Sequence, residues 1–266
     1  MRCQFSAYFT SVKRIISNTL LLVAQSYYGD RNLKSDWVLC SLLLVALSIF
    51  STQSHASGVL PESSAVIIDE AQKGGSINVK NTEKVPVLLY TRIVELPDDP
   101  TPRLIVTQPV ARLEPGQSQR VRFVLNTDTP LQIEHIKRVY FEGVIERTTD
   151  NSQVSVSVRQ DLPVIIVPKG LSTKRDMWTD LDWSVSANSL KVTNTGRHVV
   201  RLTPQVKLQP AGNVLSLNKS YILPGETLVV TAPASTRLSS QQQVAFSPVT
   251  RYGFGVGVQT APLSGK

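Results

Sequence analysis

Over most of this chain, apolar residues alternate with polar ones in short runs, and this period of two constrains the fold more than any other feature. Beyond Ser57 the runs are bounded by Pro, Gly, Asn and Asp, which favour turns. Examples are Lys73-Gly74-Gly75 and Glu114-Pro115-Gly116, where a fixed proline φ or a permissive glycine backbone allows the chain to bend. No stretch carries a clean apolar stripe over two helical turns. The pattern predicts an all-β protein.

The alternation predicts two sets of strands, separated by the break Pro168-Lys169-Gly170 and a polar segment after it. The first set comprises Val59–Asp69, Ser76–Asn81, Val85–Glu95, Arg103–Thr107, Ser118–Leu125, Arg138–Arg147 and Val154–Val167. The second set comprises Asp182–Ser186, Ser189–Asn194, His198–Leu208, Val214–Leu217, Glu226–Thr231, Gln243–Ser247 and Tyr252–Val258. We expect two antiparallel sandwich domains, residues 57–170 and 171–266, in preference to a single barrel.

The N-terminal region has the order of parts that a secretory signal peptide has. An uncharged apolar run, Trp37–Phe50, follows Arg31 and Lys34, and the small residues of Ser54-His55-Ala56 come after it. The run is shorter than the roughly 20 residues that span a bilayer. We therefore expect residues 1–56 to be a signal region that is cleaved after Ala56. An uncleaved membrane anchor is the alternative, because a second apolar stretch occupies residues 15–24.

Two further expectations concern this region. The signal looks complete from Lys34, which suggests that the start of translation has been assigned too far upstream. Both cysteines, Cys3 and Cys40, lie within the removed part, so the mature chain contains neither a disulfide framework nor a cysteine-built zinc site.

We find no pattern typical of catalysis or nucleic-acid binding. His135 and His198 do not form an HExxH pair, no GxSxG elbow occurs, and the neighbouring acids Asp98 and Asp99 are expected in a solvated turn. The formal charge is +8, but aromatic residues make up 6% of the chain, too few for a base-stacking surface. The sequence predicts a protein that is not an enzyme and needs no metal, cofactor or nucleic acid.

The segment from Val154 to Pro168 obeys two rules in succession. Val154, Val156 and Val158 alternate with polar residues, whereas Val164–Val167 is continuously apolar, as in a strand buried on both faces. Pro163 lies between the two halves and lacks a ladder donor, which suits a bulge or a sheet edge. The alternating half is either an ordinary half-buried strand or an edge strand that is donated to a partner.

A motif in the first domain resembles the P-x-x-R-L-x-P-G signature, with a later V-R, of PapD-like periplasmic pilus chaperones. The matching residues run from Gln108 to Arg122. The resemblance extends over Val59–Pro262, with further matches at Ala65–Asp69, Asn81–Pro86, Val139–Phe141 and Ile222–Gly225.

This resemblance implies two immunoglobulin-like domains in a boomerang arrangement. It implies a periplasmic chaperone that donates an edge strand to pilus (fimbrial) subunits and delivers them to an outer-membrane usher. The family's subunit-binding residues fall on Val154, Val156 and Val158. The sequence leaves open whether the protein caps itself as a homodimer when idle.

The family's two basic residues that anchor the C-terminal carboxylate of the pilin are replaced here by Ser64 and Pro163. Either Arg159 and Arg92 take over this role, or the grip relies on the valines and the backbone. The departure suggests a divergent member of alternate or archaic type. The rival function is a structural or adhesive β-sandwich surface protein, such as a pilin, although residues 57–64 lack the alternating donor segment that a self-polymerising pilin needs.

Overall fold

Strands dominate the chain from Gly58 onward, as the alternation predicted. The computed structural model describes residues 58–145, 158–234, 236, 238–240 and 242–265, all within the unit Ala56–Lys266. Across these residues the helical elements are two 3-10 helices, η1 (Glu70–Gln72) and η2 (Met177–Asp180). No helix in this part of the chain is long and apolar enough to cross a membrane. The predicted signal region lies outside the described residues.

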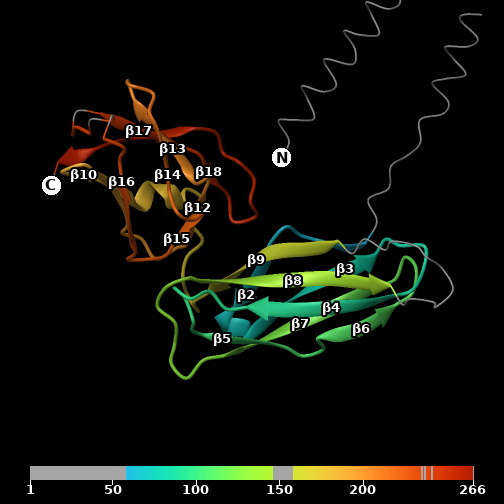
Figure 1. Cartoon of the computed structure of the whole chain (residues 1–266). Coiled ribbons are helices and arrows are strands. Elements are labelled where there is room, and N and C mark those ends of the chain that lie inside the picture. Colours follow the sequence, from blue (N-terminus) through green and yellow to red (C-terminus); the bar gives the residue numbers. More distant parts are fainter. Residues whose placement is uncertain (1–57, 146–157, 235, 237, 241, 266) are drawn as a thin grey trace, which may run out of the picture. The chain divides into compact units, whose positions relative to one another are not determined.

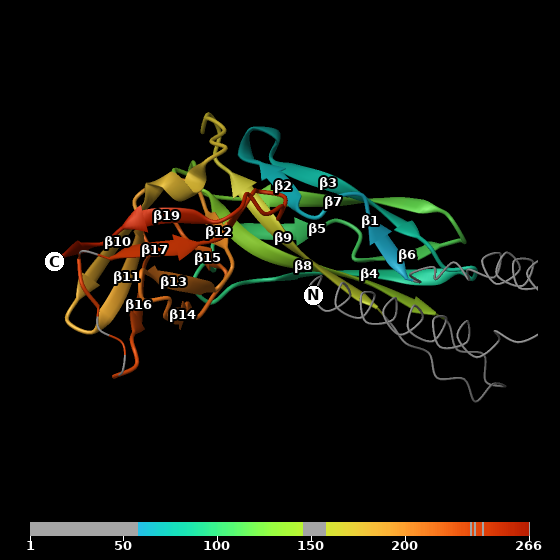
Figure 2. The same cartoon turned by 90° about the horizontal axis from the view of Figure 1, so that it is seen from above.

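The first half folds one hydrogen-bonded sheet into two layers. Its strands are β1 (Val59–Pro61), β2 (Val66–Asp69), β3 (Gly74–Asn81), β4 (Val87–Val94), β5 (Arg103–Val106), β6 (Val110–Leu113), β7 (Ser118–Asn126), β8 (His135–Ile145) and β9 (Arg159–Val167). They pair in the order β5-β7-β3-β2-β9-β8-β4-β6, with β1 also on β3. The strand β2 meets β3 through a single residue pair and runs parallel to β9, so the sheet turns over at β2 (Figures 1 and 2).

Alternate residues of both layers fill the space between them. Ile77 and Val79 point inward from β3, and Val139 and Phe141 point inward from β8, all at most 2% exposed. The period of two therefore sets the core of this half, because successive side chains of a strand point to opposite faces.

Two details of the first half differ from the sequence prediction. The single strand expected over Val59–Asp69 was wrong, because the chain leaves one layer after Pro61 and enters the other at Val66. The four polar or small residues 62–65 make this crossing. The strand β6 was missed, although it lies inside the motif and pairs with β4.

The second half forms a second sandwich with its own core. Its strands are β10 (Leu181–Ser186), β11 (Ser189–Asn194), β12 (Val200–Leu202), β13 (Gln205–Gln209), β14 (Val214–Ser216), β15 (Tyr221–Ile222), β16 (Thr227–Thr231), β17 (Gln243–Phe246), β18 (Pro248–Val249), β19 (Gln259–Pro262) and β20 (Ser264–Gly265). They form three sheets, β16-β11-β10-β20, β15-β12-β18 and β14-β13-β17-β19. Trp183 packs against Phe246 in the core, with ring centroids 5.2 Å apart.

Two predicted strands of this half were also wrong. The run His198–Leu208 is broken at residues 203–204, where Pro204 cannot donate to a ladder. The run Tyr252–Val258 forms a loop between β18 and β19. Gly253 (φ 82°) and Gly257 (φ 85°) adopt left-handed backbone conformations there, which interrupt an extended strand.

A buried asparagine closes one corner of the first sandwich. The Asn81 amide donates to the carbonyls of Val85 (3.0 Å) and Leu113 (3.1 Å), and its side-chain oxygen accepts from the Glu83 N–H (2.8 Å). The Asn81 carbonyl accepts from the N–H of Gly116 (3.1 Å), in the predicted Pro-Gly turn. Each polar atom of this buried side chain is thus satisfied.

The second sandwich repeats this corner. The Asn194 amide donates to the carbonyls of His198 (2.8 Å) and Ile222 (3.0 Å), and its oxygen accepts from the Gly196 N–H (3.0 Å). Its carbonyl accepts from the N–H of Gly225 (2.8 Å), again in a Pro-Gly turn. Both halves therefore use a buried asparagine to close the same kind of corner.

Candidate functional site

One edge of β9 is unpaired over its first residues. The strand pairs with β8 from Arg159 to Ile166, but β2 covers its other edge only from Val164 to Val167. No strand of the described chain pairs with that other edge between Arg159 and Pro163. Pro163, which has no N–H, lies at the last position before β2 begins, as expected for a sheet edge. This segment offers backbone groups to an additional strand.

The faces of β9 agree with the continuous apolar run Val164–Val167 in its sequence. Leu162, Val164 and Ile166 belong to the core of the first sandwich, while Ile165 packs on the opposite face with Ile136 and Val199. The continuous apolar run is therefore buried on both faces, as predicted. Val158 is four positions before Leu162, which places it on the same face of an extended strand, but its side chain is 40% exposed.

The structure places one of the three predicted subunit-binding valines. Val158 immediately precedes β9 and its Cβ lies close to Gly58, next to β1. Val154 and Val156 lie outside the described residues.

A groove of about 570 Å³ lies along the unpaired edge. It is lined by Leu60, Pro61, Glu62, Ser63, Ser64, Gln160, Asp161, Leu162, Tyr252 and Phe254. The Ser64 hydroxyl donates to the Tyr252 carbonyl at 2.6 Å. This hydrogen bond connects the β18–β19 loop to the segment between β1 and β2. The charged residues among those lining the groove, Glu62 and Asp161, are acidic.

The two arginines proposed as anchors lie around one tyrosine. The Arg159 guanidinium stacks over the Tyr140 ring, 4.3 Å from its centroid, and Arg92 is the cross-strand partner of Tyr140 on β4. Neither arginine belongs to the set that lines the groove, whereas Ser64 does. Asp161 is paired with Arg138 at 2.7 Å. An anchoring role for Arg159 and Arg92 stays a prediction.

Sequence reasoning missed an apolar patch on the outer face of the same layer. Leu88 and Tyr90 of β4 are 43% and 51% exposed, next to Val144 of β8 and Val110 of β6. We call these four residues the outer patch. The continuous apolar run of residues 87–90 was its signal, since a strand facing water on one side should alternate.

The predicted solvated turn at Asp98 and Asp99 was wrong for Asp99. This carboxylate is 6% exposed, accepts from the Ile136 N–H (2.7 Å) and lies 2.7 Å from His135 Nδ1. Asp98 accepts from the Tyr221 hydroxyl (2.9 Å) and is paired with Lys219 (2.5 Å). These contacts give the carboxylates of Asp98 and Asp99 a structural role. Within the described residues, no group of three or more His, Cys, Asp or Glu could hold a metal ion.

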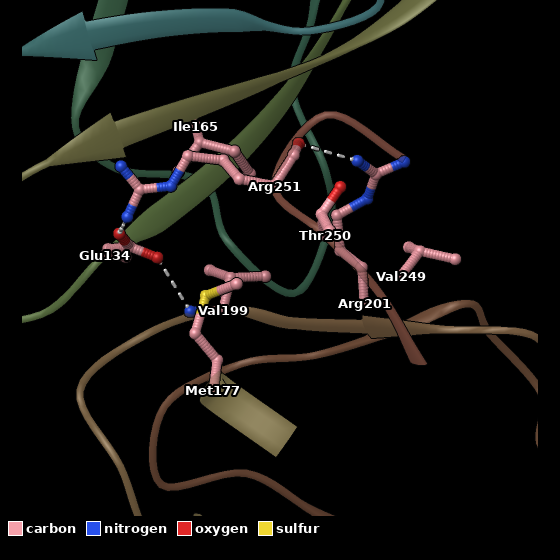
Figure 3. A pocket seen from close by; sticks show the side chains of 8 residues that line it. All are labelled: Glu134, Ile165, Met177, Val199, Arg201, Val249, Thr250 and Arg251. Atoms are coloured by element: carbon pink, nitrogen blue, oxygen red, sulfur yellow. Dashed lines mark hydrogen bonds and ion pairs between the residues drawn. The ribbon is translucent and has the colours of Figure 1, made fainter. Parts of the chain in front are cut away.

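The loop that carries Tyr252 is held by a buried glutamate (Figure 3). Glu134 Oε1 pairs with Arg251 Nη2 at 2.5 Å, and Oε2 accepts from the Val199 N–H at 3.0 Å. Burial raises the pKa of Glu134, although Arg251 and the Val199 N–H oppose the shift. From the other side, Arg201 Nη1 donates to the Arg251 carbonyl at 3.1 Å.

Comparison with known proteins agrees with this architecture. Residues 58–172 match the family described as "Pili and flagellar-assembly chaperone, PapD N-terminal domain". The uncharacterized fimbrial chaperone YhcA of Escherichia coli K12 is 42% identical over 214 residues, which cover 79% of this chain and 94% of YhcA.

Solved structures agree on the fold. The SafB chaperone, solved in complex with the SafA pilin of Salmonella enterica, gives a TM-score of 0.62 at 20% identity, covering 79% of this chain and 98% of the matched one. The E. coli chaperone DraB gives 0.61 at 22% identity, covering 77% and 98%. The predicted all-β, two-domain fold class is confirmed, and the pilin-like alternative is not favoured. The chain belongs to the PapD-like family of fimbrial chaperones.

Proposed function

We propose that this chaperone holds a pilus subunit on the unpaired edge of β9 and passes it to an outer-membrane usher. The observation that carries the proposal is the edge from Arg159 to Pro163, which has a groove beside it and no strand partner within the described residues. A relative of similar fold, SafB, is known in complex with the SafA pilin.

The physical basis is strand complementation. A subunit that lacks its last strand exposes an apolar groove and unpaired backbone groups, and an inserted edge strand satisfies both. Val158, with Val154 and Val156 before it, would enter successive pockets of the pilin. Burial of three valine side chains contributes on the order of 4–8 kcal/mol before the costs of association. Folding of the pilin and exchange of this strand for a strand of the next pilin supply the energy, without a nucleotide.

The outer patch supports transfer to an usher. A pilin on the β9 edge occupies the edge and the groove, whereas the patch lies on the outer face of β4, β6 and β8. An exposed apolar patch on a soluble protein marks a surface for a further protein contact. We assign the outer patch to the usher.

Export and anchoring complete the proposal. Fimbrial chaperones of this family are periplasmic, and we propose that the signal region of residues 1–56 directs export and is removed near Ala56. We also propose that the boundary between the two domains lies near Gly170. Arg159 and Arg92 are our candidates for contact with the C-terminal carboxylate of the pilin.

Co-expression with the pilin encoded beside this chain tests the function. We expect a one-to-one complex by affinity purification and mass spectrometry. Val156→Asp and Val158→Asp should abolish capture, because a charge cannot enter an apolar pocket without a partner. Val229→Asp, at an exposed valine on β16 (55%), is the control. Normal recovery of the pilin with both edge variants, each folded by circular dichroism, would refute the proposed edge.

A further inference from the structure

The β18–β19 loop exposes two aromatic side chains. Phe254 is 68% exposed and Tyr252 is 45% exposed, two residues apart on a loop that we call the aromatic loop (residues 250–258). Aromatic residues make up 6% of the whole chain, so an exposed pair of them is conspicuous. Large aromatic side chains left in water next to a groove are typical of interaction surfaces.

The aromatic loop is ordered by its own hydrogen bonds. The Thr250 N–H donates to the Phe254 carbonyl (2.8 Å), and the Phe254 N–H donates to the Thr250 hydroxyl (3.1 Å). The Gly253 N–H donates to the Thr250 carbonyl (2.8 Å), and the positive φ of Gly253 permits this tight turn. Contacts of Arg251 with Glu134 and Arg201 hold the loop from outside. A surface that is already ordered loses little conformational entropy when a partner binds.

The same loop forms one wall of the groove beside the unpaired β9 edge. Tyr252 and Phe254 line this groove together with Gln160 and Leu162 of β9, and the Ser64–Tyr252 hydrogen bond connects the loop to the segment between β1 and β2, which also lines the groove. A strand that adds to β9 between Arg159 and Pro163 therefore runs next to the aromatic rings. The groove is continuous with the proposed subunit-binding edge.

The residues that line the groove favour an apolar side chain over an acidic one. Its charged lining residues are Glu62 and Asp161, and the described residues that line it include no lysine or arginine. In this described lining, no basic residue is available to pair with a free carboxylate, whereas an apolar side chain would bury against the rings.

We propose that Tyr252 and Phe254 grip an apolar side chain of the pilin strand that pairs with β9. The aromatic loop then provides a second contact with the pilin, from the C-terminal half of the chaperone. This inference rests on the proposed function, because it assumes a pilin strand on β9.

Photo-crosslinking tests the position of the contact. With p-benzoylphenylalanine in place of Phe254, illumination of the co-expressed complex should link the chaperone to the pilin encoded beside it. Mass spectrometry should map the link to the pilin strand that pairs with β9, at an apolar residue. The same probe in place of Val229 is the control and should give no link. Absence of a link at position 254 in a complex that does form would overturn the inference.

Affinity provides the second test. We expect Tyr252→Ser combined with Phe254→Ser to weaken capture by about tenfold or more, because burial of an aromatic side chain is lost. Val214→Ser with Val229→Ser, both exposed on the same half, should leave affinity unchanged. If the wild-type chain captures no pilin, the proposed function fails. If it captures the pilin and the aromatic variant binds equally well, the proposed function stands and this inference fails.

Discussion

Glu134 is the residue at which burial and pairing oppose each other most directly. Its side chain is almost completely buried, yet it pairs with Arg251 and accepts the Val199 N–H. Desolvation is the larger effect, so the pKa of Glu134 lies above its ordinary value of 4.5. By contrast, burial acts to raise the pKa of Asp98, but the hydrogen bonds from Lys219 and Tyr221 outweigh it and lower that pKa.

The first prediction follows from the sign of the Glu134 shift. The folded chain takes up a proton on Glu134 at a higher pH than the unfolded chain does. Its contribution to stability therefore increases as the pH falls from neutral, through the folded pKa, towards about 4.5. We expect the free energy of unfolding of the wild type to rise relative to Glu134→Gln over this interval.

Urea unfolding of both proteins at a series of pH values measures this difference. Asp98→Asn is the control. The pKa of Asp98 lies below its ordinary value of 3.8, so Asp98 stays ionised across the interval, and the stability difference between the wild type and Asp98→Asn should not change with pH. A wild-type advantage that stays flat or shrinks on acidification would contradict the assigned shift.

At the scale of elements, the layer β6-β4-β8-β9 has two separate surfaces. Its β9 edge and groove are the proposed site for a pilin strand, while the outer patch presents side chains from β4, β6 and β8. Leu88 pairs with Val144 across β4 and β8, and Leu89 beside it points into the core. A change at Leu88 can therefore alter the outer face without disturbing the core.

The second prediction separates the two surfaces. Leu88→Asp should reduce delivery to the usher at least tenfold, because a charge placed in the contact must be desolvated without a partner. Capture of the pilin should stay normal, since the β9 edge is unchanged. Pull-down of the pilin-loaded chaperone on the purified usher measures delivery, with Val229→Asp as the matched surface control. Loss of pilin capture by Leu88→Asp would show that the two surfaces are not independent.

At the scale of the whole molecule, each half has its own core. Phe141 lies in the first core, and Trp183 lies in the second. The two described tryptophans, Trp178 and Trp183, belong to the second half, so their fluorescence reports on that half. Polar contacts such as Glu134–Arg251 and Asp98–Lys219 join residues of the two halves.

The third prediction tests the expected domains, residues 57–170 and 171–266. In the chain from Ser57 onward, Phe141→Ala should destabilise the first half by about 3–5 kcal/mol, so that its part of the unfolding transition of the whole chain, followed by circular dichroism, moves to lower temperature. The tryptophan transition should shift much less, because Phe141 packs within the other core. Leu190→Ala, in the second core, should shift the tryptophan transition instead. Equal shifts of both signals in both variants would indicate a single cooperative unit.

Much of the fold was predictable from the sequence because it follows from local pattern. The period of two predicted β-structure and most strands of the first half, including those that form β3 and β8. The continuous run Val164–Val167 predicted burial on both faces of β9. Pro163 suggested a bulge or a sheet edge, and it lies where the unpaired edge ends. The motif from Gln108 to Arg122 predicted the family.

The tertiary structure decided which segments become neighbours. A strand pattern specifies the face of each residue but not the partner strand. It could therefore not reveal that residues 62–65 take the chain from pairing with β3, in β1, to pairing with β9, in β2. Nor could it reveal that Asp99 meets His135, or that four apolar residues gather on the outer face. The aromatic loop was predicted as a strand because its apolar residues alternate. Positive-φ glycines turned it into a loop, and contacts distant in sequence placed it beside the β9 groove.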